Sequence, residues 1–158
     1  MPYPTLESRA DVLKMLYAMT EWRKSILDRC ARLTPAQLND PVYAGTWSLL
    51  KNLAHLAWGE AWMLAWIKAR PGPLPAERRP PEPPLELPAI RTALDEAHAA
   101  VIAFLKANPE DVLREKCVYS RTGEQTVGGV LFHLIEHEIH HRAFLLNKLA
   151  KLEAPDVA

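Results

Sequence analysis

The sequence contains few cysteines, and this scarcity argues against a protein held together by disulfides. Only Cys30 and Cys117 occur among the 158 residues. They lack the Cys-x-x-Cys spacing of a zinc ribbon or a redox motif. We therefore expect two thiols of a reducing compartment, with a disulfide between them as the less favoured alternative.

An excess of charge of either sign is also missing. Lysine and arginine together number 19, and aspartate and glutamate together also number 19. This balance provides no electrostatic attraction for nucleic acid or for an anionic membrane surface. Neither nucleic acid nor a membrane is therefore expected as a partner.

Long hydrophobic runs are absent as well. The most apolar segment, residues 49–67, is interrupted by Lys51, Asn52, His55 and Glu60, and these polar residues argue against a membrane span. The opening stretch MPYPTLESRADVL does not combine a basic region with an apolar one, so it does not read as a secretory signal. We expect a cytoplasmic protein.

What the sequence does contain is helical periodicity, in a length suited to one domain spanning residues 1–158. Apolar residues recur at helical spacing in four long segments, which proline or polar turn residues separate. The expected long helices are residues 8–32, 47–69, 88–107 and 125–152. Ser8 and Thr34 are suitable N-caps, Thr34 for a short helical turn that ends near residue 40. Residues 115–122 are expected to be extended.

Prolines are concentrated between the second and third long helices. Residues 71–88 hold eight of the 14 prolines, which excludes a regular element there. We interpret this segment as a long crossover loop, partly polyproline-like, and not as a domain boundary. Since no repeat or strand alternation is long enough to build a sheet, the pattern predicts an all-α fold, a four-helix bundle.

Four of the six histidines fall within HLIEHEIHHR, residues 133–142. On a helix, His137 and His141 form an i, i+4 pair at the edge of the buried face, close enough to bind one ion. His140 is directed towards solvent, and His133 continues the row nearer the outer edge. The pattern therefore indicates half of a metal site.

A third ligand has to come from another helix, and His55 in KNLAHLAWGEAW is the candidate. A single histidine in such surroundings is otherwise a hydrogen-bonded core residue. The helix has an apolar stripe of leucines on one side and a stripe with His55, Trp58, Trp62 and Trp66 on the other. Periodicity leaves open which stripe meets the bundle interior, and the tryptophans are expected to serve packing or a dimer contact.

Glu138 projects into the buried stripe of the last helix, where a leucine would be usual. Its i, i+3 spacing to His141 occurs in carboxylate-bridged di-metal bundles, and Asp95 and His98 form a loose second copy. Glu60 is the one further inward-facing glutamate, so the di-metal pattern is incomplete and is kept as the minor alternative.

In the favoured interpretation four residues surround a single metal site without binding the metal. Glu138 is expected to pair with Arg142 one turn along, or to orient a ligand histidine. Glu60 and His133 are the other candidates for this supporting role. No catalytic residue is assigned from the sequence.

Together, Trp47 with the following LLKNLAHLAWGEAW and the run LFHLIEHEIHHR resemble the DinB-like family of metal-dependent four-helix-bundle proteins. The resemblance covers the whole chain. It implies one divalent metal ion (zinc, nickel or iron) held by His55, His137 and His141. The sequence departs from the family at Ala143 and Phe144, where a glycine followed by glutamine or glutamate is common, and this bears on the substrate more than on the metal.

The resemblance also implies a function. Some members of the wider family are S-transferases that use a low-molecular-weight thiol such as bacillithiol, mycothiol or glutathione. A divalent metal lowers the pKa of a bound thiol, which could then attack a small electrophile. We therefore expect metal-dependent thiol transfer to a small-molecule substrate in a homodimer. The alternatives are a non-catalytic stress-response bundle that binds a metal or a small molecule, and a solvated histidine-rich helix without metal.

Overall fold

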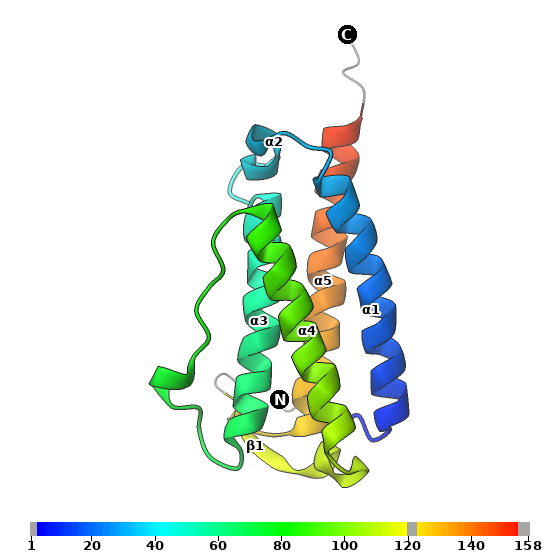
Figure 1. Cartoon of the computed structure of the whole chain (residues 1–158), viewed down its shortest axis with the longest axis vertical. Coiled ribbons are helices and arrows are strands. Elements are labelled where there is room, and N and C mark those ends of the chain that lie inside the picture. Colours follow the sequence, from blue (N-terminus) through cyan, green and yellow to red (C-terminus); the bar gives the residue numbers. More distant parts are fainter. Residues whose placement is uncertain (1–2, 120–122, 155–158) are drawn as a thin grey trace.

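Hydroxyl side chains begin three of the four long helices. The computed structural model describes residues 3–119 and 123–154, and it contains α1 (Arg9–Cys30), α3 (Leu49–Ala69), α4 (Leu87–Ala107) and α5 (Val127–Glu153) (Figure 1). Ser8, Ser48 and Thr126 each accept a hydrogen bond from the backbone N–H three residues further on. The four predicted long helices are confirmed, and α1 starts at the predicted cap.

Short elements connect the helices. Thr34 caps α2 (Pro35–Asn39) in a reciprocal capping box with Gln37, as its sequence predicts. Two 3₁₀ turns, η1 (Ala76–Arg78) and η2 (Glu110–Arg114), precede and follow α4.

The extended segment forms half of a hairpin. β1 (Lys116–Tyr119) pairs antiparallel with β2 (Gly123–Thr126), with Lys116 opposite Thr126. The prediction of an extended piece at 115–122 is confirmed over β1, whereas its residues 120–122 lie outside the described residues. The expected start of the last helix at Gln125 is wrong by two residues, because Gln125 belongs to β2 and Thr126 caps the helix.

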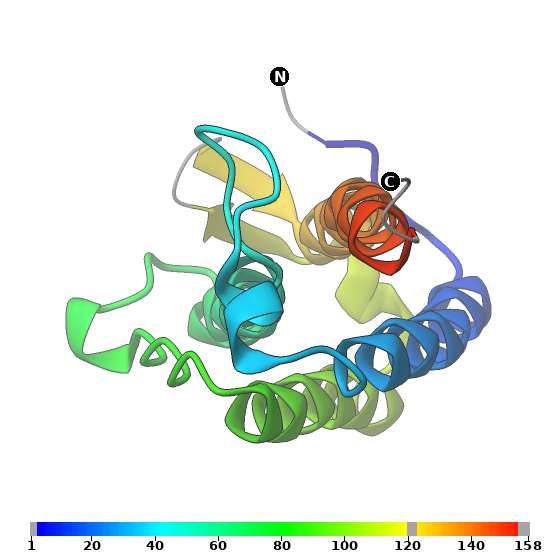
Figure 2. The same cartoon turned by 90° about the horizontal axis from the view of Figure 1, so that it is seen from above.

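The order of the helices explains the long loop. Seen from above, α1 and α3 lie at opposite corners, and each packs against both α4 and α5 (Figure 2). Neighbours α3 and α4 run in the same direction, so the chain has to return along the bundle between them (Figure 1). The 21 residues of α3 extend about 30 Å. Residues 70–86 can span that length because a polyproline-like chain advances about 3.1 Å per residue.

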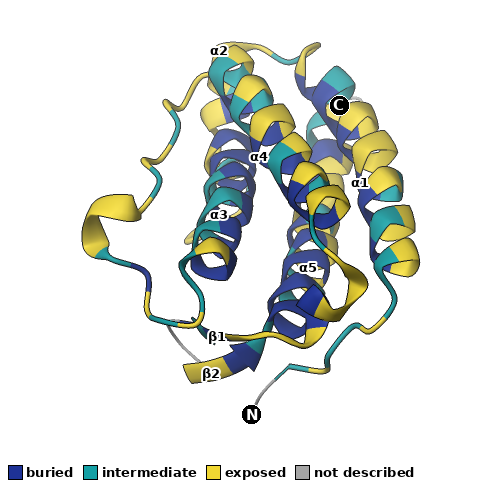
Figure 3. Ribbon diagram, turned by 60° about the horizontal axis from the view of Figure 1, so that its bottom comes forward, coloured by how far each residue is buried: buried dark blue, intermediate teal, exposed yellow. Residues whose placement is uncertain are grey.

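The leucine stripe of α3 faces the interior, which answers the question that periodicity left open. Its members are at most 5% exposed: Leu49, Leu53, Leu56, Met63, Leu64 and Ile67. The inner faces of all four long helices are buried in the same way (Figure 3). None of the helices in the described ranges combines the length and the apolar character that a bilayer span requires.

The tryptophan side of α3 is covered by other parts of the same chain. Trp58 Nε1 donates a hydrogen bond to the carbonyl of Pro80 in the long loop, at 3.0 Å. Trp62 and Trp66 both contact the ring of Tyr119 in the hairpin. The packing role expected for this stripe is therefore confirmed within one chain.

Both cysteines are buried and unpaired. Burial raises the pKa of each thiol to about 11. The expectation of two thiols without a disulfide is confirmed, and neither thiol is poised as a nucleophile.

Candidate metal centre

Helices α3 and α5 bring three histidines together. One ring nitrogen from each of His55, His137 and His141 lies within 4.8 Å of the others. The Nε2 atoms of His55 and His137 are 3.0 Å apart, and the ring centroids of His137 and His141 are 4.5 Å apart. The structure thus unites the i, i+4 pair of α5 with the predicted third residue.

A glycine allows the two helices to approach at this point. Gly59 lies one turn after His55 on α3, and a Cβ added there would be 3.1 Å from His137 Cε1. The single Cβ of an alanine would already force the imidazole to move by a few tenths of an ångström. Gly59 therefore makes room for His137 beside His55.

Asn52 orients the third histidine. Its Nδ2 donates to the carbonyl oxygens of Trp47 and Ser48, at 3.2 and 2.8 Å. Its Oδ1 is therefore an acceptor, and it receives the Nδ1–H of His141 at 3.2 Å. The proton thus resides on Nδ1, and the Nε2 lone pair of His141 is left to bind a ligand.

Sequence reasoning missed this role of Asn52. The signal was present, because Asn52 is a buried polar residue one turn before His55, in a segment of leucines and alanines. A buried amide in such a segment has to find hydrogen-bond partners.

The environment keeps the two imidazoles of α5 neutral. Burial lowers the pKa of His137 to about 3, and repulsion from the neighbouring histidines acts in the same direction. Burial, with the proximity of His55 and His140, likewise lowers the pKa of His141 to about 4. At neutral pH both rings are uncharged, which is the form that binds a metal ion.

The donor set fits a divalent metal. Three imidazoles are a typical protein contribution to a catalytic zinc site, and nickel and iron(II) accept similar nitrogen donors. The hydrogen bond from His141 to Asn52 supplies the supporting contact that metal-binding histidines usually make.

We predict that Asn52→Leu weakens metal affinity by about 10- to 100-fold, because His141 loses the acceptor that holds its proton on Nδ1. Competition with a chelating dye measures the affinity. Asn147→Leu, the same change at an exposed position of α5, is the matched control and should bind metal normally. Equal affinities in the two variants would contradict the role assigned to Asn52.

Glu138 and Glu60 are bound by an arginine that sequence reasoning did not consider. Arg23 of α1 contacts Glu138 through Nε and Nη2, at 3.1 and 2.9 Å, and its Nη1 is 2.7 Å from Glu60 Oε2. His98 Nδ1 lies 2.7 Å from the other oxygen of Glu60. Arg23, Glu60, Glu138 and His98 form a buried cluster, which we call the Arg23 cluster.

The Arg23 cluster overturns two expectations. The pairing of Glu138 with Arg142 is wrong, since the guanidinium of Arg142 instead lies 4.1 Å from the ring centre of Trp22. The di-metal alternative is also wrong, because the guanidinium of Arg23 already pairs with both inward-facing glutamates. Among the described residues, the three histidines form the only group with metal-ligand geometry.

The remaining histidines of the sequence run lie outside the three-histidine group. His133 stacks on Tyr3, with ring centroids 4.4 Å apart, and its Nδ1 is 3.1 Å from Glu136. His140 is exposed, as predicted.

Trp47 lines two hollows beside the histidines. One hollow, of about 260 Å³, is lined by His141, Asn52 and Lys148, among others. The other, of about 330 Å³, is lined by His55, Lys51 and residues of the long loop. Each hollow therefore gives a small molecule access to one of the three histidines.

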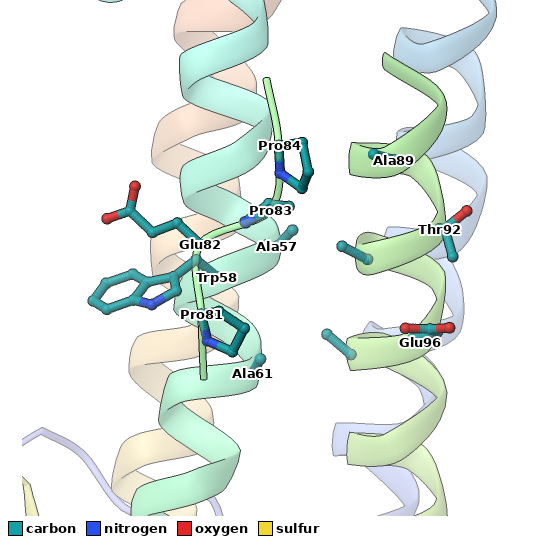
Figure 4. Close-up of a pocket in the computed structure, with 12 residues that line it drawn as sticks. Ala57, Trp58, Ala61, Pro81, Glu82, Pro83, Pro84, Ala89, Thr92 and Glu96 are labelled. Atoms are coloured by element: carbon teal, nitrogen blue, oxygen red, sulfur yellow. The ribbon is translucent and has the colours of Figure 1, made fainter. Parts of the chain in front are cut away.

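A wider groove of about 610 Å³ lies between the long loop and α4 (Figure 4). Ala57 and Ala61 of α3 lie on one side of it, and Ala89 of α4 lies on the other. Trp58 borders both this groove and the hollow that contains His55. Trp58 is therefore a wall residue as well as a packing residue.

The chain is similar to known proteins in both sequence and fold. The sequence profile of the DinB superfamily matches residues 18–145. No protein of curated function matches the chain. The three solved structures described next are each less than 25% identical to this chain and show the fold alone.

Three such structures illustrate the likeness. TT2238, described as a four-helix bundle protein, is 24% identical, with a TM-score of 0.66 over 89% of this chain and 99% of its own. YfiT from Bacillus subtilis, described as "a probable metal-dependent hydrolase with an unusual four-helix bundle topology", is 15% identical, with a TM-score of 0.72 over 96% and 94%. The DinB-like protein YjoA, also from Bacillus subtilis, is 14% identical, with a TM-score of 0.67 over 92% and 95%.

Proposed function

The chain belongs to the DinB superfamily, and from this premise we propose that it is a metal-dependent enzyme that activates a small thiol for attack on a small electrophile. One observation carries the proposal: three imidazoles from α3 and α5 converge with their nitrogens within 4.8 Å. His55, His137 and His141 would hold the metal. A divalent ion bound there would lower the pKa of a thiol or a water molecule, so that it reacts in its deprotonated form at neutral pH.

The nucleophile has to come from outside the chain. Cys30 and Cys117 are buried elsewhere, with raised pKa values. In the hollows, the only hydroxyl-bearing side chain among the described lining residues is Thr46, and it donates to the carbonyl oxygens of Pro41 and Tyr43. A small thiol or a water molecule is therefore the available nucleophile.

Water as the nucleophile defines a second candidate, a metal-dependent hydrolase. The fold shared with YfiT, itself described as a probable metal-dependent hydrolase, favours this candidate. The two reactions would use the same three histidines and differ only in what occupies the open position.

Elemental analysis of protein purified without a histidine tag tests the metal site. After equilibration with zinc, nickel or iron(II), the wild type should hold about one ion per chain. His137→Ala/His141→Ala should hold almost none. His133→Ala/His140→Ala removes two histidines from the same helix and serves as the matched control, which should remain loaded. Loss in both double variants, or in neither, would refute the site.

Turnover assays then separate the functions. Consumption of an aryl halide that depends on both metal and added thiol would support thiol transfer. Hydrolysis of a nitrophenyl ester without thiol would support the hydrolase. A loaded protein that does neither would favour the non-catalytic stress-response bundle. Light scattering on the same sample checks the homodimer that the sequence analysis leads us to expect.

A further inference from the structure

A buried lysine faces the same hollow as His141. The hollow of about 260 Å³ is walled by residues 45–47, Asn52, Phe144, His141 and Lys148. Lys148 is only 2% exposed. Lysine is rarely buried to this extent without a partner that satisfies its charge.

Among the described residues, the ammonium of Lys148 has only neutral hydrogen-bond partners. It donates to the carbonyl of Pro41 and to Thr46 Oγ1, the latter at 2.6 Å, and it lies 5.4 Å from the ring centre of Tyr43. An ammonium has three N–H donors, so these two contacts leave one N–H without a partner in the part of the chain that the structure describes.

None of the ion pairs in the described part of the chain includes Lys148, and Asp40 acts on its ammonium only at longer range than 4 Å. Burial consequently lowers the pKa of Lys148. A buried charge with no counter-ion is costly, so an anion entering the hollow would be stabilised there.

Lys148, His137 and His141 lie on the same side of α5. Lys148 follows His141 by seven residues, which places the two on nearly the same face, about 10 Å apart along the axis. Helical side chains lean towards the N-terminus, so the lysine stem extends back in the direction of His141. One small molecule could therefore reach both groups.

The other side of Trp47 is also basic. Lys51 lies 5.2 Å from the centre of the Trp47 ring and lines the hollow that contains His55. Glu82 is the one acidic residue among the described residues that line either hollow. The approach to the three histidines therefore carries more positive than negative side chains, which favours an anionic ligand.

We infer that the hollow beside His141 binds the carboxylate of a small anionic molecule, with Lys148 as the residue that pairs with that carboxylate. The other end of the molecule reaches the three-histidine centre, and this second half of the inference rests on the proposed function. The role of Lys148 is thus to determine specificity for acids over neutral analogues.

Two small thiols, one ending in a carboxylate and the other in a neutral hydroxyl, test the inference. Mercaptopropionate and mercaptoethanol are thiols of similar length, and thiolate binding to cobalt(II)-loaded protein is followed by its charge-transfer absorption. Wild type should bind mercaptopropionate about tenfold or more tightly than mercaptoethanol, the contribution of one charge-assisted hydrogen bond. Lys148→Met should bind both equally, whereas Lys148→Arg should keep a preference for the acid.

Lys148 could also act only by holding residues 41–46 in place. The variant Thr46→Val distinguishes this structural role from carboxylate binding. This variant removes one hydrogen bond of the ammonium and keeps its charge, so the preference for mercaptopropionate should persist. Loss of the preference in Thr46→Val, or its survival in Lys148→Met, would overturn the inference while leaving the metal site intact.

Titration of metal-free protein with propionate keeps the inference testable if cobalt does not bind. In NMR spectra, the amide signals of Thr46 and of residue 148 should shift with propionate in wild type and should not shift in Lys148→Met. Failure of cobalt to bind would refute the proposed metal site. Absence of a propionate response at these residues would refute the carboxylate site.

Discussion

Replacing Arg23 by methionine is expected to lower the free energy of unfolding by about 3–5 kcal/mol, the usual cost of removing one partner from a buried ion pair. Arg23 is 7% exposed, and Glu60 and Glu138 are each 2% exposed. Without the guanidinium, two carboxylates would remain in the core, and the imidazole of His98 would be the one basic group left in the Arg23 cluster. The helices α1, α3 and α5 would lose the group that joins them.

The cost in Arg23→Met should shrink as the pH falls. Burial alone would raise the pKa of Glu60, but the charge of Arg23 and the hydrogen bond from His98 outweigh burial and lower it. The ionised Glu60 therefore stabilises the folded wild type at pH values above the ordinary pKa of a glutamate. This stabilisation is lost as the pH falls through the lowered pKa of Glu60. In Arg23→Met the pKa of Glu60 should rise instead, so protonation in mild acid relieves the defect.

Urea unfolding of wild type and Arg23→Met at pH 7 and pH 5 measures both effects. Arg91→Met removes an arginine whose contact with Asp28 is long, 3.5 Å, and partly exposed. It is the matched control and should cost less than about 1 kcal/mol. A cost of that small size in Arg23→Met would show that the Arg23 cluster does not hold the helices together.

Saturation with the preferred metal ion is expected to stabilise the wild type by about 4 kcal/mol when the free ion exceeds its dissociation constant about 1,000-fold. For a chain of this length, such a change raises the melting temperature on the order of 10 °C. His137→Ala should show almost no shift, because it removes one of three ligands. Calorimetry with and without metal measures the difference, and a wild-type melting temperature that ignores the metal would contradict the site.

The metal-free protein should become less stable as the pH falls from about 6.5 towards 4. In the folded chain, burial lowers the pKa of His137 to about 3 and that of His141 to about 4, whereas unfolded histidines titrate near 6.5. Between these values the unfolded chain binds more protons, so acid favours unfolding, on the order of 1 kcal/mol per pH unit. Unfolding in the presence of a chelator measures this slope, which should be shallower in His137→Ala/His141→Ala.

Local sequence determined the helices and half of the candidate site. Ser8 and Thr34 are recognisable caps because a short hydroxyl side chain accepts a hydrogen bond from the backbone three residues on, a purely local interaction. The pairing of His137 with His141 is equally local, because helical geometry places residues i and i+4 together. The prolines of 71–88 excluded regular structure for an equally local reason, the missing N–H.

Contacts between helices could not be read in this way. Periodicity predicts where Glu138 projects on its own helix, but not which residue of α1 it meets, so Arg23 was overlooked in favour of Arg142. Of the hairpin, the sequence predicted β1 but not β2. The pairing of β2 with β1 depends on the chain reversing its direction and not on the pattern of residues 123–126.

The sequence by itself therefore determined four amphipathic helices, a crossover loop and an i, i+4 histidine pair, since each depends on neighbours along the chain. Only the tertiary structure decided that the leucine side of α3 faces inward and that His55 meets His137 beside Gly59. It also decided that Asn52 orients His141 and that Lys148 shares a hollow with it. These relations depend on the rotation and spacing of one helix against another, which packing of the whole core sets and no single segment encodes.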